Sequence, residues 1–263
     1  MDIDKIIESG ELFLIAGPCV IESEELCLEI ASHLKELSRK HDIPVIFKSS
    51  YAKANRTSLK SFVGNGIDYG LEVLAKVKRD FGFPLLTDVH ETIEIPRVAE
   101  VVDILQIPAF LSRQTELIRQ AGASGKWVNI KKGQFMSPHD MDKAAAKAES
   151  KRVMLTERGA SFGYHNLVVD FRSLLIMRSF GFPVVFDATH SLQLPSGSGT
   201  VSSGQPEFVI PFARAAAAVG VDGLFVETHP NPQKALSDAG AMLPMDQMEK
   251  LISEVLKIRR VLK

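Results

Sequence analysis

Eight short apolar runs recur along this 263-residue chain, and they constrain its fold more than any other feature. Each run is mostly apolar on both of the faces that a strand would present, as expected for a parallel sheet covered on both sides. Helical patterns separate the runs; those that stand out cover 22–40, 70–82, 137–150 and 248–262. The apolar runs occupy 12–17, 45–49, 84–89, 103–108, 127–132, 152–157, 184–189 and 223–228.

Strands that alternate with helices over about 250 residues are typical of a (β/α)8 TIM barrel. We therefore predict an α/β chain with a single barrel domain over residues 1–263. The alternative is a doubly wound open sheet, which would normally carry a glycine-rich phosphate fingerprint after its first strand. Here Gly17-Pro18-Cys19 follows that strand, and the lone GxG at Gly64–Gly66 has no strand directly before it.

The charge balance gives no electrostatic case for a polyanionic partner, because 31 Lys and Arg face 32 Asp and Glu. We therefore expect no nucleic-acid partner and no membrane attachment, and the apolar stretches are too short to span a bilayer. Cys19 and Cys27 suggest no disulfide framework, and the acidic N-terminus lacks the features of a secretory signal. These features favour a cytoplasmic protein.

In a TIM barrel the carboxyl ends of all strands meet at one face, where active sites lie. Polar or reactive residues stand at or just after every predicted strand end, although a buried unpaired charge there would be costly. We therefore predict that they form a functional site at that face. They are Cys19, Lys48, Asp88, His90, Gln106, Lys131, Glu157, Arg158, His190, Glu227 and His229.

Two chemical groups stand out near these strand ends. The first is cationic and suits phosphate or carboxylate ligands, because several ammonium and guanidinium groups would converge on one opening. The second combines thiol, imidazole and carboxylate, the donors of borderline divalent metals such as zinc, iron or manganese. Cys19 could instead be a small core residue, as we expect for Cys27. The cations are Lys48, Lys53, Arg56, Arg113, Lys131, Lys132 and Arg158, and the metal candidates are Cys19, His190, Glu227 and Asp238.

A segment rich in Ser, Gly and Pro, 191–206, follows the seventh predicted strand. A stretch of this length without secondary structure is either a surface loop or a lid. Because it follows a strand end that carries predicted site residues, we favour a lid over the site.

Long motifs spread over nearly the whole chain add to this interpretation. They are IAGPCVIES (15–23), FKSSYAKANRTS (47–58), LLTDVHE (85–91), DILQIPAFLSRQTEL (103–117), VNIKKGQF (128–135), LTERGASFGYHNLVVDFRSL (155–174), FDATHSLQLP (186–195) and ETHPNPQKALSDAGAML (227–243). With these motifs the chain resembles the 3-deoxy-D-manno-octulosonate 8-phosphate synthases, also called 2-dehydro-3-deoxyphosphooctonate aldolases. The resemblance implies a homotetrameric TIM barrel that condenses phosphoenolpyruvate with D-arabinose 5-phosphate and water for lipopolysaccharide synthesis.

The resemblance also implies roles residue by residue. Catalytic roles would belong to Cys19, Lys53, His190 and Asp238. Phosphoenolpyruvate would be bound by Lys48, Ser49, Gln106, Ala109, Lys131, Arg158 and His190. Arabinose 5-phosphate would be bound by Lys53, Asn55, Arg56, Ser58, Phe110 and Arg113, of which the last two would reach a neighbouring subunit's site.

The family divides into metal-dependent members with cysteine in the Gly-Pro-Cys motif and metal-independent members with asparagine there. Cys19 therefore implies one divalent metal per subunit, among zinc, iron, manganese, cobalt and cadmium. The resemblance gives it the ligands Cys19, His190, Glu227 and Asp238. The chain departs from the pattern at Gln205-Pro206, where relatives often have an arginine before Glu-Phe. The departure removes a phosphate contact or lid latch that such an arginine could supply.

Three other functions remain open at this point. A 3-deoxy-D-arabino-heptulosonate 7-phosphate synthase, which uses erythrose 4-phosphate, shares the barrel and the metal residues. Those relatives carry Lys-Pro-Arg where this chain has KANR, so Asn55 favours the octulosonate family. A Schiff-base aldolase would use Lys131 as nucleophile and would leave the metal residues unexplained. A non-catalytic phosphosugar-binding barrel would not need the cations and all four metal residues together.

Overall fold

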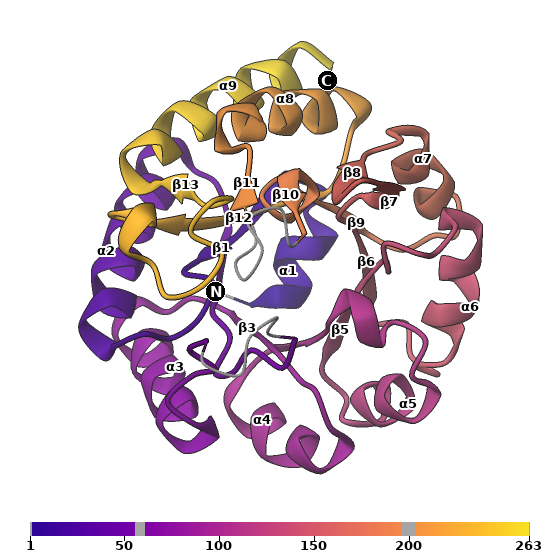
Figure 1. The fold of residues 1–263 in the computed structure, drawn as a ribbon, viewed down its shortest axis with the longest axis horizontal. Coiled ribbons are helices and arrows are strands. Elements are labelled where there is room, and N and C mark those ends of the chain that lie inside the picture. The colour runs from indigo at the N-terminus through magenta and orange to yellow at the C-terminus, as the bar shows by residue number, and fades with distance from the viewer. Residues whose placement is uncertain (1, 56–60, 196–202, 263) are drawn as a thin grey trace.

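The computed structural model describes residues 2–55, 61–195 and 203–262, and within them the chain forms the predicted TIM barrel. Parallel strands pair in chain order, and β1 pairs with both β2 and β12, which closes the sheet (Figure 1). Each barrel strand overlaps one of the predicted apolar runs. The barrel strands are β1 (Phe13–Gly17), β2 (Val45–Lys48), β3 (Leu85–Asp88), β4 (Ile104–Ile107), β5 (Trp127–Lys131), β6 (Val153–Glu157), β9 (Val184–Asp187) and β12 (Gly223–His229).

Helices surround the closed sheet on its outer side (Figure 1). The predicted helices at 22–40, 70–82 and 248–262 are confirmed as α2, α3 and α9, whereas 137–150 holds an α-helix only over α6. The surrounding helices are α2 (Glu24–His41), α3 (Ile67–Phe81), α4 (Ile95–Val101), α5 (Thr115–Ala123), α6 (Met141–Ala146), α7 (Arg172–Arg178), α8 (Val209–Val219) and α9 (Met248–Leu262).

Local sequence explains where these helices begin and end. The Ser23 side chain accepts a hydrogen bond from Leu26 N and caps the start of α2. The same helix ends at Asp42, which adopts a left-handed conformation with φ of 51°, and α3 ends at Gly82 with φ of 70°. Ile30 and Leu34, four residues apart on α2, are buried in the core, as an amphipathic helix on a sheet requires.

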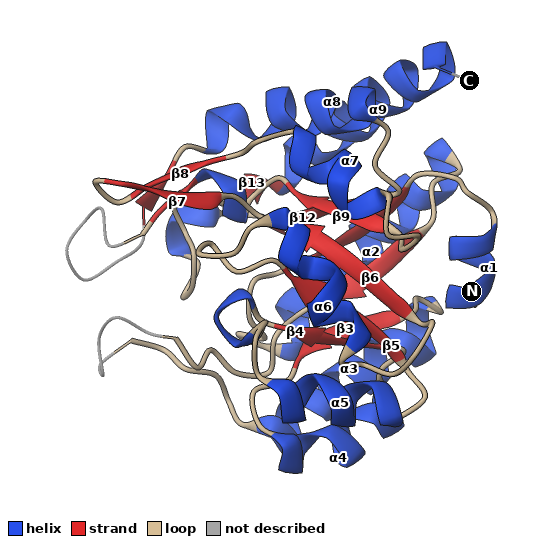
Figure 2. Ribbon diagram, turned by 90° about the vertical axis from the view of Figure 1, so that its right-hand side faces the viewer, coloured by secondary structure: helices blue, strands red, loops and turns tan. Residues whose placement is uncertain are grey.

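The barrel interior is apolar at the end where the strands begin. Inward-facing side chains form one cluster there, and Ile3 and Ile6 of α1 (Ile3–Glu8) cover it. Asp4 fastens this unpredicted helix by accepting hydrogen bonds from Trp127 Nε1 at 2.7 Å and Arg152 Nη2 at 2.8 Å. Figure 2 shows α1 at one end of the barrel, opposite the loops that follow the strands. The strand residues of the cluster are Phe13, Ile15, Ile46, Leu86, Ile104, Trp127, Met154, Val185 and Phe225.

Short strands that the sequence did not reveal lie at the opposite end. β7 (Ala160–Gly163) pairs with β8 (Asn166–Val168), and β13 (Leu243–Pro244) pairs with β12. The hairpin of β7 and β8 projects beyond the barrel strands (Figure 2). Within the predicted lid, β10 (Gln193–Leu194) pairs with β11 (Ser203–Gly204), while 196–202 lies outside the described residues, so the lid stays a prediction. No helix in the described part of the chain is long and apolar enough to cross a membrane.

Candidate active site

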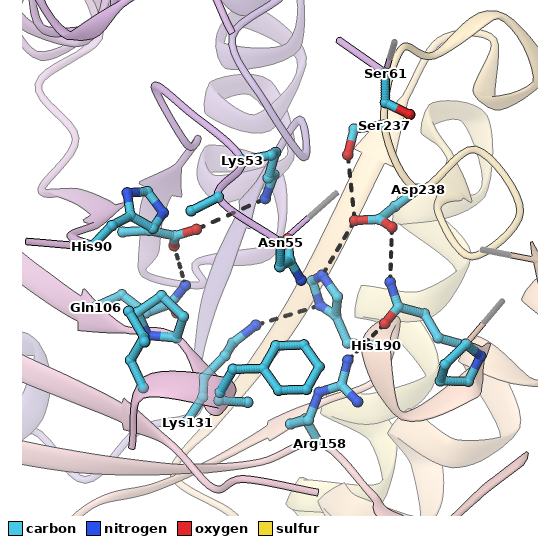
Figure 3. Close-up of a pocket in the computed structure, with 18 of the residues that line it drawn as sticks. Lys53, Asn55, Ser61, His90, Gln106, Lys131, Arg158, His190, Ser237 and Asp238 are labelled. Carbon is cyan, nitrogen blue, oxygen red and sulfur yellow. Dashed lines mark hydrogen bonds and ion pairs between the residues drawn. The ribbon is translucent and has the colours of Figure 1, made fainter. Parts of the chain in front are cut away.

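A cavity of about 820 Å³ opens at the carboxyl ends of the strands, the face where the sequence analysis expects the site (Figure 3). Loops that follow different strands supply its walls, which is how a TIM barrel assembles a site from distant segments. Arg56 and Ser58 lie outside the described residues, and Arg113, which is described, does not line the cavity. The predicted site residues that line it are Lys48, Lys53, Asn55, Asp88, His90, Gln106, Ala109, Phe110, Lys131, Arg158, His190 and Asp238.

Gly17 explains how Cys19 reaches the site. A Cβ atom at Gly17 would collide with the backbone carbonyl of Lys48, so only glycine lets the chain leaving β1 pass this close to β2. The chain then places the buried Cys19 thiol 3.0 Å from Asp238 Oδ2 and 3.0 Å from Ser237 Oγ. Cys27 is instead buried in the outer core on α2, as expected.

Three of the predicted metal ligands converge. Cys19, Glu227 and Asp238 each offer a donor atom, and these atoms all lie within 4.8 Å of one another. His190, the fourth, turns Nε2 towards the same place, at 3.4 Å from Glu227 Oε2 and 3.8 Å from Asp238 Oδ2. Donors bound to one zinc-sized ion are spaced by about 3–4 Å, so this arrangement fits a divalent cation.

The electrostatics of these donors also favour a cation between them. Burial, together with Asp238 and Glu227, raises the pKa of the Cys19 thiol well above its usual value. Burial would also raise the pKa of Glu227, but His190 and Lys48 outweigh it and lower that pKa to about 2. Lys48 Nζ donates to Glu227 Oε1 at 2.5 Å. The thiol therefore needs a further positive charge nearby to ionise, which a bound metal would supply.

Asp187, which the sequence analysis did not single out, orients the imidazole of His190. Its Oδ2 lies 2.7 Å from His190 Nδ1, and its Oδ1 accepts from His190 N at 2.8 Å. Burial would raise the pKa of Asp187, but His190 and Lys131 hold it well below its usual range. A carboxylate can only accept here, so Nδ1 carries a proton, and Nε2 is the ring nitrogen that faces the metal candidates. An aspartate three residues before a strand-end histidine was the available signal.

Lys131 and Arg158 form a cationic wall of the cavity beside the metal candidates. Lys131 Nζ donates to Asp187 Oδ2 at 2.6 Å and lies 3.9 Å from the centroid of the Phe225 ring. Arg158 Nη2 donates to Gln193 Oε1 at 2.6 Å, and Gln193 Nε2 donates to Asp238 Oδ1 at 2.9 Å. Gln193, another residue that the sequence analysis missed, thus ties this wall to a metal candidate.

One terminal nitrogen of Arg158 makes no hydrogen bond to the described residues. This nitrogen, Nη1, is buried, although the side chain lines the cavity. Burial lowers the pKa of Arg158, but a guanidinium stays charged in proteins. A buried cationic N–H without a partner is costly, so the wall suits an anionic ligand that enters the cavity.

A further cation, Lys53, lines the cavity after β2, together with the neutral Asn55 (Figure 3). Lys53 Nζ donates to Ser50 Oγ at 2.8 Å and lies 3.8 Å from Asp88 Oδ2. Burial would lower the pKa of Lys53, but Cys19 and the carboxylates around it, Asp88 among them, raise it above its usual value. Lys53 therefore stays an ammonium group and can bind a second anion.

Two predicted charges lie outside the cavity wall. Lys132 is buried, with Nζ 3.5 Å from Glu157 Oε1, and neither residue is among the described ones that line the cavity. Glu157 Oε2 accepts from Ser173 Oγ at 2.6 Å, and Glu157 Oε1 accepts from Gly159 N at 2.7 Å. This pair therefore braces the turn that carries Arg158, and Lys132 adds no ligand to the cavity.

Comparison with known proteins gives consistent matches over almost the full length. Residues 4–263 match the model of the DAHP synthetase I family. The 2-dehydro-3-deoxyphosphooctonate aldolase of Bordetella petrii is 58% identical over 260 residues, which cover 95% of this chain and 92% of that protein. The proteins of the same name from Methylibium petroleiphilum (57% over 260 residues; 95% and 91%) and Xanthomonas campestris pv. campestris strain B100 (58% over 255 residues; 96% and 92%) are similarly close.

Proposed function

The chain belongs to the DAHP synthetase I family, and from that premise we propose that it is a 2-dehydro-3-deoxyphosphooctonate aldolase. It condenses phosphoenolpyruvate with D-arabinose 5-phosphate and water to give 3-deoxy-D-manno-octulosonate 8-phosphate and phosphate, a step in lipopolysaccharide synthesis. The observation that carries this proposal is one cavity lined by cations from different strands, Lys131 and Arg158 at the ends of β5 and β6 and Lys53 after β2. Such a cavity suits two phosphorylated substrates held close together.

Phosphoenolpyruvate occupies the deep side of the cavity in this proposal. Lys48, Lys131 and Arg158 bind its phosphate and carboxylate, and the unpartnered Arg158 Nη1 gains an acceptor. Two anionic substrates repel each other, so cations that are already in place lower the cost of bringing them together. Gln106, Ala109 and His190 line the same cavity, with Ser49 buried next to Lys48.

The pentose phosphate binds on the other side, with its phosphate near Lys53 and Asn55. Arg56 and Ser58 add to this group on the sequence prediction. Phe110 lines the cavity of its own chain, and Arg113, outside that lining, reaches an adjoining subunit of a tetramer. The aldehyde carbon then faces C3 of phosphoenolpyruvate. The new carbon–carbon bond forms there, water adds at C2, and the bond from C2 to the phosphate oxygen breaks. Holding both substrates in attack geometry supplies much of the rate enhancement.

Cys19, His190, Glu227 and Asp238 would hold one divalent metal, which would supply Lewis acidity for an oxygen of water or of the aldehyde. The chain's own residues prepare these donors. Asp187 keeps the proton on His190 Nδ1, Lys48 holds Glu227 in place, and Gln193 binds one oxygen of Asp238. These contacts orient the donors before any ligand binds.

The test is phosphate release from phosphoenolpyruvate by chelator-treated protein, with arabinose 5-phosphate or erythrose 4-phosphate and with or without Zn²⁺, Mn²⁺ or Fe²⁺. We expect turnover with the pentose phosphate that requires metal. Activity without metal would keep the reaction and remove the metal role of Cys19. Activity only with the tetrose phosphate would make the chain a heptulosonate synthase.

The Schiff-base alternative has an independent test, because borohydride traps a lysine imine. Burial lowers the pKa of Lys131 despite the opposing effect of Asp187. Its Nζ nevertheless donates to Asp187 Oδ2 at 2.6 Å, so it is held in an ion pair, whereas an imine requires a free amine. We therefore expect no substrate mass on Lys131 after borohydride treatment, and a trapped adduct would overturn the condensation mechanism.

A further inference from the structure

Side-chain hydrogen bonds run along the inner wall of the barrel from β6 to the end of β2. Thr156 Oγ1 donates to Asn129 Oδ1 at 2.6 Å, and Asn129 Nδ2 donates to Gln106 Oε1 at 2.9 Å. Gln106 Nε2 donates in turn to Asp88 Oδ1, whose other oxygen accepts from Ser50 Oγ at 2.8 Å. We call Thr156, Asn129, Gln106 and Asp88 the interior chain; Figure 3 shows its cavity end, where Gln106 meets a carboxylate.

The charge on Asp88 sets the direction of every bond in the interior chain. A carboxylate only accepts, so Gln106 must present its amide nitrogen to Asp88 and its oxygen to Asn129. Asn129 must then present nitrogen to Gln106 and oxygen to Thr156, which is left to donate. Burial would raise the pKa of Asp88, but Lys53, followed by other nearby cations, holds it below its usual range, so Asp88 remains ionised.

This direction matters because Gln106 lines the cavity. Its amide nitrogen carries two N–H groups, and Asp88 uses one of them. The second N–H is therefore available to an anion in the cavity. If the amide were reversed, its carbonyl oxygen would stand beside the same anion and repel it.

We propose that Asn129 is a positioning residue that holds the Gln106 amide with an N–H, and not its carbonyl oxygen, towards phosphoenolpyruvate. Asn129 is fully buried and is absent from the cavity lining that the structure describes, so it acts only through Gln106. This inference rests on the proposed function for the identity of the anion. The hydrogen-bond pattern itself does not depend on that identity.

Asn129→Asp tests the proposal, because it replaces the donor to Gln106 by an acceptor at nearly constant volume. Gln106 then lies between two carboxylates, and its amide loses its fixed orientation. We expect the KM for phosphoenolpyruvate to rise by about 10–100-fold, as for a lost hydrogen bond to a charged group. The KM for arabinose 5-phosphate should change much less, because Lys53 keeps its contacts.

A second substitution separates positioning from folding. In Asn129→Asp/Asp88→Asn, the new amide at position 88 can accept from Ser50 and donate to Gln106 Oε1, while Gln106 Nε2 donates to the new carboxylate at position 129. Every hydrogen bond between Gln106 and its neighbours is restored with donor and acceptor exchanged. The urea midpoint, which Asn129→Asp should lower, should therefore largely recover. The Gln106 amide is fixed in the reversed orientation in this variant, however, and the KM for phosphoenolpyruvate should remain raised by at least about tenfold.

Recovery of the KM together with stability would show that Asn129 matters only for folding, and it would overturn the proposal. An unchanged KM in Asn129→Asp would do the same. Where Asn129→Asp alone does not fold, the double variant carries the test. Thr156→Val should raise the same KM by about threefold, because Asn129 then loses the hydrogen bond that fixes its own amide.

Thr228→Val is the matched control, since Thr228 is equally buried and its hydroxyl donates to Leu243 O, at 2.9 Å, outside the interior chain. It should lower the urea midpoint and leave the KM for phosphoenolpyruvate unchanged. Turnover by the unmodified chain is measured first. If that turnover is absent, the proposed function fails by itself, and calorimetric binding of phosphoenolpyruvate to the same variants still decides the role of Asn129.

Discussion

The two halves of the barrel interior differ in chemistry although the same strands build both. Where the strands begin, Ile46, Leu86 and Ile104 pack in an apolar cluster. Two residues further along each of these strands, the inward positions hold Lys48, Asp88 and Gln106. Side chains of a strand alternate between faces, so a step of two residues moves along the same wall from core to site.

The difference teaches what each half contributes. Apolar side chains are held by burial and shape, and neighbours of similar volume can replace them at small cost. Buried charges are different, because each needs a partner of opposite charge. Removing one partner leaves the other charge buried and unpaired. Lys48 with Glu227 and Lys131 with Asp187 are such pairs. The apolar half of the barrel interior should therefore tolerate substitutions that keep side-chain volume. The charged half should lose function even when the volume is kept.

The largest effect is expected for Lys48→Met, which keeps most of the side-chain volume but removes the charge. Glu227 then loses the partner at 2.5 Å while it stays buried. We expect kcat/KM for phosphoenolpyruvate to fall by about 1,000-fold, as for a lost donor to a reacting anion. The free energy of unfolding of metal-free protein should fall by about 3–5 kcal/mol. Phosphate release and urea unfolding measure the two effects.

Lys76→Met is the matched control, because it makes the same change in a surface ion pair. Lys76 pairs with Glu24, and both side chains are about one-third exposed (33% and 37%). Exposed pairs contribute about 0–1 kcal/mol, so activity should not change. Equal losses in both variants would contradict the contrast between buried and exposed charge.

Asp187→Asn should have the next largest effect. The new amide can donate to His190 Nδ1, which places the ring proton on Nε2, 3.4 Å from Glu227 Oε2, and leaves that nitrogen without a lone pair for a metal. We expect the affinity for Zn²⁺, measured by competition with a chelator, to fall by about 10–100-fold. Asp222→Asn is the control at the other end of β9, where the carboxylate accepts from Val184 N. Equal zinc affinity in Asp187→Asn and the unmodified chain would refute the orienting role.

The sequence predicted where both halves of the barrel interior lie, but it did not predict which side chains pair in the charged half. The apolar runs located the strands, and the polar residues at or just past their ends, such as Lys131, indicated the face at which the cavity opens. The partners of those residues depend on which strands adjoin and in what register. Asp187 on β9 meets Lys131 on β5 because only one strand, β6, lies between these two strands in the closed barrel. Sequence spacing does not contain that relation, and Asn129 in particular looked like an ordinary strand residue.

The helix that closes the apolar end was missed for a different physical reason. α1 covers only Ile3–Glu8, too short for a helical period to be recognised in a sequence. Its position comes from two buried isoleucines and from Asp4, which binds Trp127 and Arg152. Tertiary contacts thus determine this helix, whereas α2 and α9 show their amphipathic pattern over many turns.

The smallest effect is expected for Met154→Leu, a volume-conserving change in the apolar cluster. Met154 is fully buried there, and its replacement should lower the free energy of unfolding by about 1 kcal/mol or less. Trp127, the single tryptophan, lies in the same cluster, so its fluorescence during urea unfolding reports this half directly. Both KM values and kcat should be unchanged. A clear fall in kcat without a loss of stability would contradict the separation of the two halves. The charged half would then depend on the detailed packing of the apolar half.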